Sequence, residues 1–340
     1  MVATIPAVVH AFLRGHILAA AEKFEVTVIC NSENVGLLDG LPARLILLPI
    51  ERKPSPLRDL RVLFGLFGLF RKYRFDIVHS HMPKTGLLGM LAAWMARVPV
   101  RVHTFHGEVW ATRTGLRRIA LKRLDTFVSL LATNILAVSQ SQLGFLVSER
   151  VLPLGKALVI GAGSVCGVDP VRFHPDIEAR NTIRGQMGIP MNATVILFVG
   201  RLNRDKGMLD LAMAFKSLAS KDEKVVLLLV GSEEDVSVDQ IRSICEAEAA
   251  RIYFQSFTPA PERYMAAADI FCLPSYREGL PMTVIEAAAT GLPSVASRIY
   301  GISDAVKEGS TGLLFSAGNV AELENSLWCL ISDPALRGQM

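Results

Sequence analysis

Arg201 and Lys206 are two of the positively charged residues of one short loop, GRLNRDKG at residues 200–207. The run TVILFV before it is apolar throughout, as expected for a strand buried on both faces of a parallel sheet, and a helical pattern begins near Met208. Arg201 and Lys206 are therefore expected at the carboxyl edge of that strand, where Gly200 frees the backbone. Arg binds phosphate with two parallel hydrogen bonds, and Lys binds it as a point charge. The loop fits a phosphate clamp, although an ordinary exposed basic loop would have the same composition.

A second loop suited to anion binding has the sequence PSYREGLP, at residues 274–281. It follows the apolar run DIFCL, and an alanine-rich helical pattern follows it. Pro281 is typical of the first turn of a helix, and Gly291 is typical of its end. The amides of residues 279–282 are therefore expected at a helix N-terminus, where unpaired N–H groups and the helix dipole attract anions.

Two glutamates accompany this loop. Glu278 lies in the loop itself, and Glu286 lies within the helical run VIEAAA. A carboxylate buried among apolar neighbours needs a partner. Ligand hydroxyls are suitable partners, because an ionised carboxylate only accepts hydrogen bonds. The apolar neighbours of Glu286 favour this interpretation over a glutamate that faces solvent.

Both loops belong to a series of short apolar strands that alternates with longer helical patterns. Such alternation indicates βαβ units, so we expect two doubly wound α/β domains, 1–168 and 169–340. The boundary falls near residues 168–175, where two prolines interrupt any regular pattern. Open α/β sheets bind ligands outside the carboxyl ends of their strands, and two such sheets facing each other would enclose a cleft for a small molecule.

The expected strands span residues 25–30, 44–48, 76–80, 100–104, 134–138, 157–160, 194–199, 224–230, 251–255, 269–273, 294–297 and 312–315. The clearest helical patterns span residues 56–73, 84–95 and 116–132.

The composition of the 340-residue chain excludes several classes of protein. Apolar residues make up 51% and charged residues 20%, whereas disordered chains have low hydrophobicity and high net charge. The apolar run at residues 62–70 is far shorter than the roughly 20 residues of a membrane-spanning helix. Arg14 and His16 interrupt the apolar start of the sequence, so no cleavable signal is expected either.

The cysteines give no sign of a disulfide framework or a zinc site, because they are scattered and form no CxxC pair. We expect them to be reduced and buried as small hydrophobic residues, in a cytoplasmic protein. They are Cys30, Cys166, Cys245, Cys272 and Cys329.

The positive charge is concentrated in the first half of the chain. Residues 1–168 contain 20 Lys and Arg against 10 Asp and Glu, whereas residues 169–340 contain 16 against 22. The basic half, and the helix TGLRRIALKRL at 114–124 above all, is suited to an anionic membrane surface or an anionic substrate. A merely solvated basic face is the alternative, and no nucleic acid partner is expected.

The combination of GRLNRDKG with PSYREG and the Glu278-x7-Glu286 pair resembles the signature of the retaining glycosyltransferases of family GT4, which have the GT-B fold. FDIVHSHMPKTGLLG at 75–89 and HTFHG at 103–107 resemble acceptor-domain loops of the family's bacterial polysaccharide enzymes, and TGLLF at 311–315 resembles a late strand. The resemblance implies an acceptor-binding domain over 1–168 and a nucleotide-sugar donor domain over 169–340.

The resemblance also implies roles for individual residues. Arg201 and Lys206 would hold the donor pyrophosphate. Glu278 would accept hydrogen bonds from the transferred sugar, and Glu286 from the ribose. His106 matches a histidine that lies near the donor sugar, although a packed or helix-capping histidine is the alternative. Further donor-binding residues on the same motifs are Gly200, Gly279, Leu280, Pro281 and Met282.

The implied activity is transfer of a sugar, with retention, from a nucleotide-diphosphate sugar to a saccharide or polyprenyl-linked acceptor in surface polysaccharide or glycolipid synthesis. UDP is the default nucleotide, and no metal or other cofactor is expected. His79 and His81 look like metal ligands, but we expect them on opposite faces of their strand. The expected location is the cytoplasm, with peripheral attachment to the inner face of the cell membrane.

Two features depart from the family pattern. The first strand is usually followed by a glycine-rich loop, whereas ATIPAVVHAFLRGH contains Gly15 alone, so acceptor recognition is not carried over there. The sequence also ends at DPALRGQM, where members normally continue with a helix that returns to the N-terminal domain. We therefore expect looser interdomain packing.

Three other functions are alternatives. GAGSVCG at 161–167 resembles a dinucleotide-binding loop, but Cys166 takes the third glycine position and Pro170 prevents the required helix, which argues against a dehydrogenase. Another GT-B enzyme, such as a nucleotide-sugar epimerase or a phosphorylase-like protein, fits the two loops less well. A non-catalytic nucleotide-sugar-binding protein would bind the donor without turnover.

Overall fold

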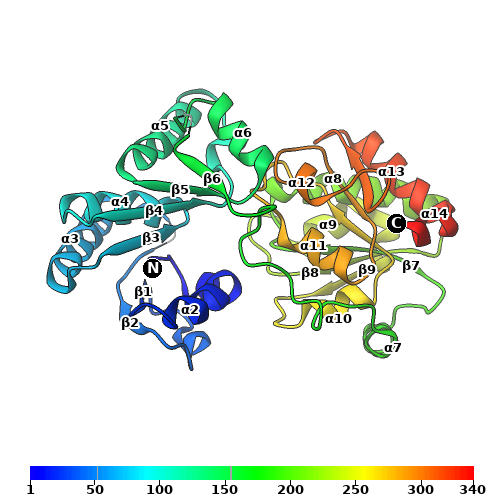
Figure 1. Cartoon of the computed structure of the whole chain (residues 1–340). Coiled ribbons are helices and arrows are strands. Elements are labelled where there is room, and N and C mark those ends of the chain that lie inside the picture. Colours follow the sequence, from blue (N-terminus) through cyan, green and yellow to red (C-terminus); the bar gives the residue numbers. More distant parts are fainter. Residues whose placement is uncertain (52, 154) are drawn as a thin grey trace. The chain divides into compact units, whose positions relative to one another are not determined.

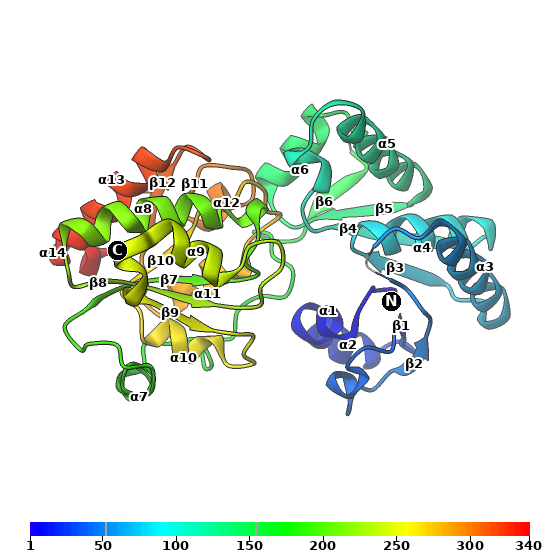
Figure 2. The same ribbon diagram turned by 180° about the vertical axis from the view of Figure 1, so that it is seen from behind.

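The structure is a computed structural model that describes residues 1–51, 53–153 and 155–340. The chain divides into two units, Met1–Cys166 and Gly167–Met340, close to the boundary expected after residue 168. Each unit is a parallel sheet covered by helices (Figure 1, Figure 2). The expected strands all form, and their ends shift by no more than two residues. Strand prediction is most secure where a strand is buried and apolar throughout, as at residues 225–230 and 270–273.

The first unit is built on parallel strands in the order β1-β2 and β3-β4-β5-β6. Val2, which lies outside every expected strand, bridges the two groups by pairing with Ile29 on one side and Ser80 on the other. Its N–H donates to the His79 carbonyl at 2.8 Å, and its carbonyl accepts from the His81 N–H at 3.1 Å. The strands are β1 (Thr27–Cys30), β2 (Arg44–Leu47), β3 (Ile77–His81), β4 (Val100–Phe105), β5 (Asn134–Ala137) and β6 (Ala157–Val159).

Helices of the first unit follow their amphipathic patterns. In α3 (Pro56–Tyr73), Asp59 accepts a hydrogen bond from the Ser55 N–H at 3.0 Å, which caps the first turn. Its buried residues recur at every fourth position, Val62, Leu66 and Phe70, and therefore form one face against the core. The remaining helices are α1 (Pro6–Val8), α2 (Arg14–Ala21), α4 (Pro83–Met95), α5 (Gly115–Leu131) and α6 (Gln140–Ser148), with shorter turns η1 (Val9–Leu13), η2 (Val35–Leu38) and η3 (Val109–Thr112).

Helix α4 packs closely on β4 because it has a glycine where the two meet. A Cβ added at Gly86 would lie 2.5 Å from the imidazole of His103, which is buried and bonded to the Ser80 hydroxyl at 2.9 Å. A side chain at position 86 would therefore displace a ring that has little room to move.

The second unit has one parallel sheet in the order β12-β11-β10-β7-β8-β9. Helices α8, α9 and α13 cover one face, and α10 and α11 cover the other (Figure 1, Figure 2). The strands are β7 (Thr194–Val199), β8 (Val225–Val230), β9 (Ile252–Gln255), β10 (Ile270–Leu273), β11 (Ser294–Ser297) and β12 (Gly312–Phe315). The helices are α7 (Ile177–Met187), α8 (Met208–Lys221), α9 (Val238–Cys245), α10 (Pro261–Ala266), α11 (Met282–Ala289), α12 (Ile302–Ala305), α13 (Val320–Ser332) and α14 (Pro334–Gln339), with turns η4 (Arg204–Lys206) and η5 (Glu246–Arg251).

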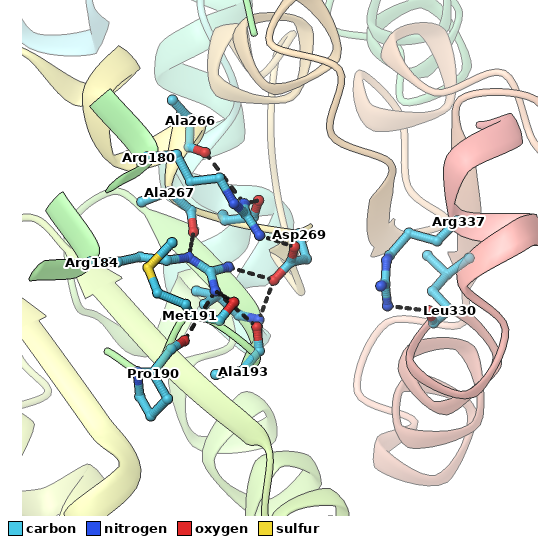
Figure 3. A network of polar contacts seen from close by, with 12 residues as sticks. Arg180, Arg184, Pro190, Met191, Ala193, Ala266, Ala267, Asp269, Leu330 and Arg337 are labelled. Atoms are coloured by element: carbon cyan, nitrogen blue, oxygen red, sulfur yellow. Dashed lines mark hydrogen bonds and ion pairs between the residues drawn. The ribbon is translucent and has the colours of Figure 1, made fainter. Parts of the chain in front are cut away.

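A buried ionic network joins α7 to the starts of β7 and β10 (Figure 3). Arg184 has no exposed surface, and its Nη2 donates to Asp269 at 2.8 Å while its Nε donates to the Ala267 carbonyl at 2.9 Å. Arg180 donates to the other Asp269 oxygen at 2.7 Å. Because each buried charge has several partners, the network fixes the amino edge of the sheet, opposite the edge that carries the two motif loops.

The expectation for the cysteines was partly wrong. Among the described residues no cysteine forms a disulfide, and Cys30, Cys245 and Cys272 are buried, but Cys166 and Cys329 are exposed. Within the described ranges, no helix combines the length and the apolar character needed to cross a membrane.

Candidate functional site

The two motif loops of the second unit follow strands that lie side by side. Strands β7 and β10 pair at Ile196 and Ile270. On one side of this pair the sheet continues with β8 and β9, and on the other side it continues with β11 and β12, so the strand order reverses between β7 and β10. Such a reversal is the point at which doubly wound sheets bind ligands, at the carboxyl ends of the strands. The fold therefore brings both loops to its most suitable ligand site.

Backbone contacts hold the two loops together. Gly207 has a positive φ of 71°, and a Cβ there would lie 2.0 Å from the Pro274 carbonyl oxygen, so only glycine fits. The Tyr276 N–H donates to the Asp205 carbonyl at 2.9 Å, and Arg277 Nε donates to the Asp205 carboxylate at 3.0 Å. These contacts were not foreseen from the sequence, because they join residues that are far apart along the chain.

The loops bring the predicted cation and the predicted carboxylate into contact. Lys206 Nζ lies 2.5 Å from Glu278 Oε1, and their side chains are 23% and 12% exposed. The pair is thus partly shielded from water, which strengthens its attraction. A ligand phosphate and a ligand hydroxyl placed here would meet opposite charges within one small site.

Arg201 is more exposed and already has an acidic partner. Its Nη1 contacts both carboxylate oxygens of Glu234, at 2.7 and 2.5 Å, and Asn203 Nδ2 donates to the same carboxylate at 2.7 Å. Gly200 ends β7 by donating its N–H to the Val230 carbonyl at 2.9 Å. Glu234 is a residue of this site that the sequence did not reveal, since it follows a different strand and lies in no recognised motif.

The helix after the second loop starts one residue later than expected. Pro281 is the N-cap of α11 and not part of its first turn, because the first helical residue is Met282. Leu280, Pro281 and Met282 are buried, and Gly291 ends the helix with φ of 77°. A Cβ at Gly301 would lie 2.3 Å from the Gly279 carbonyl oxygen, so the loop after β11 packs directly on the residues before α11.

Glu286 lies partly buried in α11. Burial raises the pKa of its carboxyl group to about 7, which Arg172 opposes and Glu262 reinforces. The group is therefore poised to gain or lose a proton near neutrality.

The first unit gathers histidines at the carboxyl ends of β3 and β4. The expectation that His79 and His81 face opposite sides was wrong, because side chains alternate along a strand and residues two apart share a face. Their ring centroids lie 4.1 Å apart. His81 Nδ1 is 3.1 Å from His106 Nε2, so the predicted His106 contacts a residue to which the sequence assigned no role.

Burial keeps these imidazoles neutral. It lowers the pKa of His79 to about 3 and that of His106 to about 4, with further lowering of the His79 pKa by nearby positive charge. The pKa of His81 also lies well below its usual value, chiefly because of burial. In the parts of the chain that the structure describes, no three His, Cys, Asp or Glu side chains are placed to hold a metal ion.

The two remaining motifs of the first unit have simple local structures. Residues 161–167 form turns with no helix after them, and the Ser164 N–H donates to the Val138 carbonyl at 2.9 Å, so the fingerprint of a dinucleotide loop is not met. The segment that replaces the usual glycine-rich loop runs from the strand-like Val2 directly into the helical elements α1, η1 and α2.

Two family models match the chain, one in each unit. A model described as glycosyl transferase 4-like domain matches residues 16–163, and a model described as glycosyl transferases group 1 matches residues 179–340. The chain is 30% identical over 322 residues to UDP-Gal:alpha-D-GlcNAc-diphosphoundecaprenol alpha-1,3-galactosyltransferase of Escherichia coli, a match that covers 93% of this chain and 82% of the relative. It is 28% identical over 292 residues to the capsular polysaccharide biosynthesis glycosyltransferase CapM of Staphylococcus aureus, with coverage of 85% and 76%.

Solved structures share the fold at lower identity. HepE of Anabaena, in complex with UDP and glucose, matches with a TM-score of 0.80 at 20% identity over 99% of this chain and 90% of that one. WaaG, a glycosyltransferase involved in lipopolysaccharide biosynthesis, matches with a TM-score of 0.74 at 17% identity over 95% and 87%. The resemblance noted in the sequence is thus confirmed, and the chain belongs to the glycosyltransferases of the group 1 and 4-like type, with the GT-B fold.

Proposed function

We propose that this glycosyltransferase moves a sugar, with retention, from a UDP-sugar to a saccharide or polyprenyl-linked acceptor in surface polysaccharide or glycolipid synthesis. The contact between Lys206 and Glu278 at the junction of β7 and β10 carries the donor part of the proposal. The E. coli relative supports the choice of UDP and of a lipid-linked acceptor, since its name contains both. CapM supports the pathway class.

The charges of the donor site suit departure of a diphosphate. When the bond to the anomeric carbon breaks, the leaving diphosphate gains negative charge, so fixed positive groups stabilise the transition state more than the ground state. Lys206, Arg201 and the N-terminus of α11 supply such groups. A bound diphosphate replaces Glu278 as the partner of Lys206, and the released carboxylate accepts hydrogen bonds from the sugar hydroxyls. Gly200 and the residues from Gly279 to Met282 shape the backbone around the donor.

The other assignments complete the proposal. Glu286 accepts hydrogen bonds from the ribose hydroxyls, and its raised pKa reflects the burial that such a subsite needs. His106 acts beside the donor sugar, as the family resemblance implies. The bond from the anomeric carbon to the diphosphate breaks through an ion-pair-like transition state, and the acceptor oxygen bonds to the carbon on the same face. The hydroxyl proton passes to the leaving diphosphate, and no divalent metal takes part. The enzyme works in the cytoplasm.

An anionic membrane surface is a further proposed partner, and α5 supports it. The exposed residues of α5 lie on one side of the helix, with Leu116 at 85%, Ile119 at 56% and Leu130 at 64% exposed. Arg123 is exposed within this apolar stripe, seven residues from both Leu116 and Leu130, and Arg117 is exposed next to it. Exposed apolar residues accompanied by basic ones are typical of helices that lie in a membrane interface.

Transfer assays with the two glutamate variants test the enzymatic proposal. A thermal-shift panel of UDP, GDP and ADP first identifies the nucleotide, since a ligand at a hundredfold its Kd adds about 2.7 kcal/mol of stability. Glu278→Gln should then mainly lower kcat, because it removes a contact near the reacting centre. Glu286→Gln should mainly raise the donor KM, because it removes a contact that stabilises the bound donor and the transition state equally.

Three results would overturn parts of the proposal. Wild-type kcat in Glu278→Gln would remove that residue from the reaction. Loss of activity in EDTA, restored by a divalent cation, would refute metal independence. Donor binding without turnover, against a broad acceptor panel, would favour a nucleotide-sugar-binding protein.

A further inference from the structure

His81 carries an unsatisfied polar atom deep in the first unit. Its side chain is 3% exposed, and its Nε2 is buried without a hydrogen-bond partner among the described residues. A buried polar atom left unpaired costs about 1–3 kcal/mol. Native proteins keep few such atoms, and those they keep often serve a function.

The only ring atom of His81 with a polar partner in the described part of the chain is Nδ1, which lies 3.1 Å from His106 Nε2. The centroids of the two rings are 5.3 Å apart, and the centroid of the His79 ring lies 4.1 Å from that of His81. His81 thus contacts both the ring of His79, whose Nε2 bonds the Thr104 hydroxyl at 2.7 Å, and the more exposed ring of His106.

The backbone of His81 is also anchored. Its N–H donates to the Val2 carbonyl at 3.1 Å, and its carbonyl accepts a hydrogen bond from the Thr85 hydroxyl in the first turn of α4. Met82, the next residue, has a left-handed φ of 71°, which a non-glycine residue adopts only when its surroundings impose it. The end of β3 is therefore rigid, and it can set the direction of a second side chain.

We infer that His81 is a positioning residue for His106, which it holds in one ring orientation and one tautomer. This inference rests on the proposed role of His106 beside the donor sugar. Two neutral imidazoles form a hydrogen bond only when one nitrogen carries a proton and the other offers a lone pair. The bond to His81 occupies His106 Nε2, so His106 Nδ1 is left as the ring nitrogen with a defined donor or acceptor character for a substrate hydroxyl.

The variants separate this role from simple packing. His81→Leu keeps an apolar side chain in the space but removes Nδ1. His81→Asn places an amide atom where Nδ1 lies, because both atoms are bonded to Cγ. His174, an exposed histidine in the other unit, provides the control His174→Leu. Thermal melting and UDP titration show whether each variant is folded.

Nitrogen NMR of the tautomers tests the inference without any need for turnover. The chain has seven histidines, so selective 15N-histidine labelling gives a spectrum that His106→Ala can assign. The wild-type protein should show one tautomer of His106, His81→Leu should show an average of both, and His81→Asn should restore the wild-type pattern. An unchanged His106 pattern in folded His81→Leu overturns the inference.

A double-mutant cycle tests the same inference in the reaction. His81→Leu should lower kcat by roughly 100-fold, the cost of misplacing a reacting group by about 1 Å, and His81→Asn should recover most of it. His81→Leu combined with His106→Ala should be no slower than His106→Ala alone, whereas multiplied losses would overturn the inference.

The NMR and kinetic experiments together distinguish failure of this inference from failure of the role proposed for His106. Normal kcat in His106→Ala would refute the role proposed for His106, while a tautomer change in His81→Leu would still establish the positioning contact.

Discussion

At the level of single residues, the positively charged side chains of the proposed donor site are paired with carboxylates, and a bound diphosphate must replace these partners. Lys206→Ala removes the cation that contacts Glu278. We expect UDP to bind at least tenfold more weakly, because a charge-assisted hydrogen bond to phosphate contributes roughly 1.5–3 kcal/mol. Uridine should bind as before, since it has no phosphate. Titration calorimetry with both ligands measures the difference.

Arg204 provides a matched control for this prediction, because it lies in the same loop and its side chain is exposed. Arg204→Ala should leave UDP affinity within about twofold of the wild-type value, the scale of a surface charge. Equal losses of UDP and uridine in Lys206→Ala would mean that the loop had moved and that no specific phosphate contact had been removed.

The raised pKa of Glu286 predicts a pH dependence of stability. The unfolded chain loses this proton near the ordinary pKa of 4.5, whereas the folded protein keeps it up to about pH 7. Between these values the folded state binds more protons, so its free energy of unfolding should fall as the pH rises. Glu286→Gln should abolish this decline and be more stable than the wild type at pH 8. Urea unfolding at pH 5 and pH 8 measures the effect.

The same proton should govern donor binding. Ribose hydroxyls donate to the ionised carboxylate, so UDP affinity should rise between pH 6 and pH 8 in the wild type and change less in Glu286→Gln. If the slope of affinity against pH is the same in both proteins, Glu286 does not contact the ribose.

At the level of strands, helices and loops, the sequence predicted the strands and the motif loops well but predicted side-chain pairings poorly. The run TVILFV identifies β7 because a strand buried on both faces must be apolar throughout. Val2 was missed because a single bridging residue shows no periodicity. The pairing of Arg201 with Glu234 was missed because it depends on which strands are neighbours, and sequence order does not give that.

The histidines show a different kind of failure. His79 and His81 were assigned to opposite faces through an error in the strand period, and the structure places them ring to ring. To predict the contact between His81 and His106, one also needs the register of β3 against β4, in which His81 lies opposite Thr104. Strand register is a tertiary property, so the pair could not be identified from motif spacing alone.

The packing of α4 on β4 gives a prediction about the contact of two elements. Gly86→Ala puts a Cβ 2.5 Å from the buried ring of His103, so we expect a net loss of roughly 1–3 kcal/mol in stability. Gly68→Ala is the control, because position 68 of α3 is exposed and a Cβ there would have no described atom within 4 Å. That variant should gain up to about 1 kcal/mol from helix propensity. Chemical denaturation measures the change in the free energy of unfolding for both variants. An equal gain in stability would show that the His103 side chain moves aside at little cost.

Across the molecule as a whole, part of the positive charge of the first half of the chain can be assigned to particular residues of α5. Of the basic residues on α5, Arg118 and Lys122 bind Glu149 at 2.9 and 2.6 Å and lie over the ring of Trp110, so they hold the helix to its own unit. Arg117 and Arg123 are instead exposed, Arg123 within the apolar stripe and Arg117 next to it. This second pair is therefore the one available to a membrane surface.

This division predicts which charges matter for membrane binding. Replacing Arg117 and Arg123 by Gln should weaken binding to anionic vesicles by about 2 kcal/mol, or roughly 30-fold, since each basic residue near such a surface contributes about 1 kcal/mol. Binding should also fall steeply with salt, because surface charges are screened. Replacing Arg118 and Lys122 should instead lower thermal stability, since Glu149 would lose both partners. Vesicle sedimentation with anionic and with neutral lipid measures the binding of each variant. Equal binding to both lipids, or an equal loss of vesicle binding in the two pairs of variants, would show that α5 does not contact the membrane through this face.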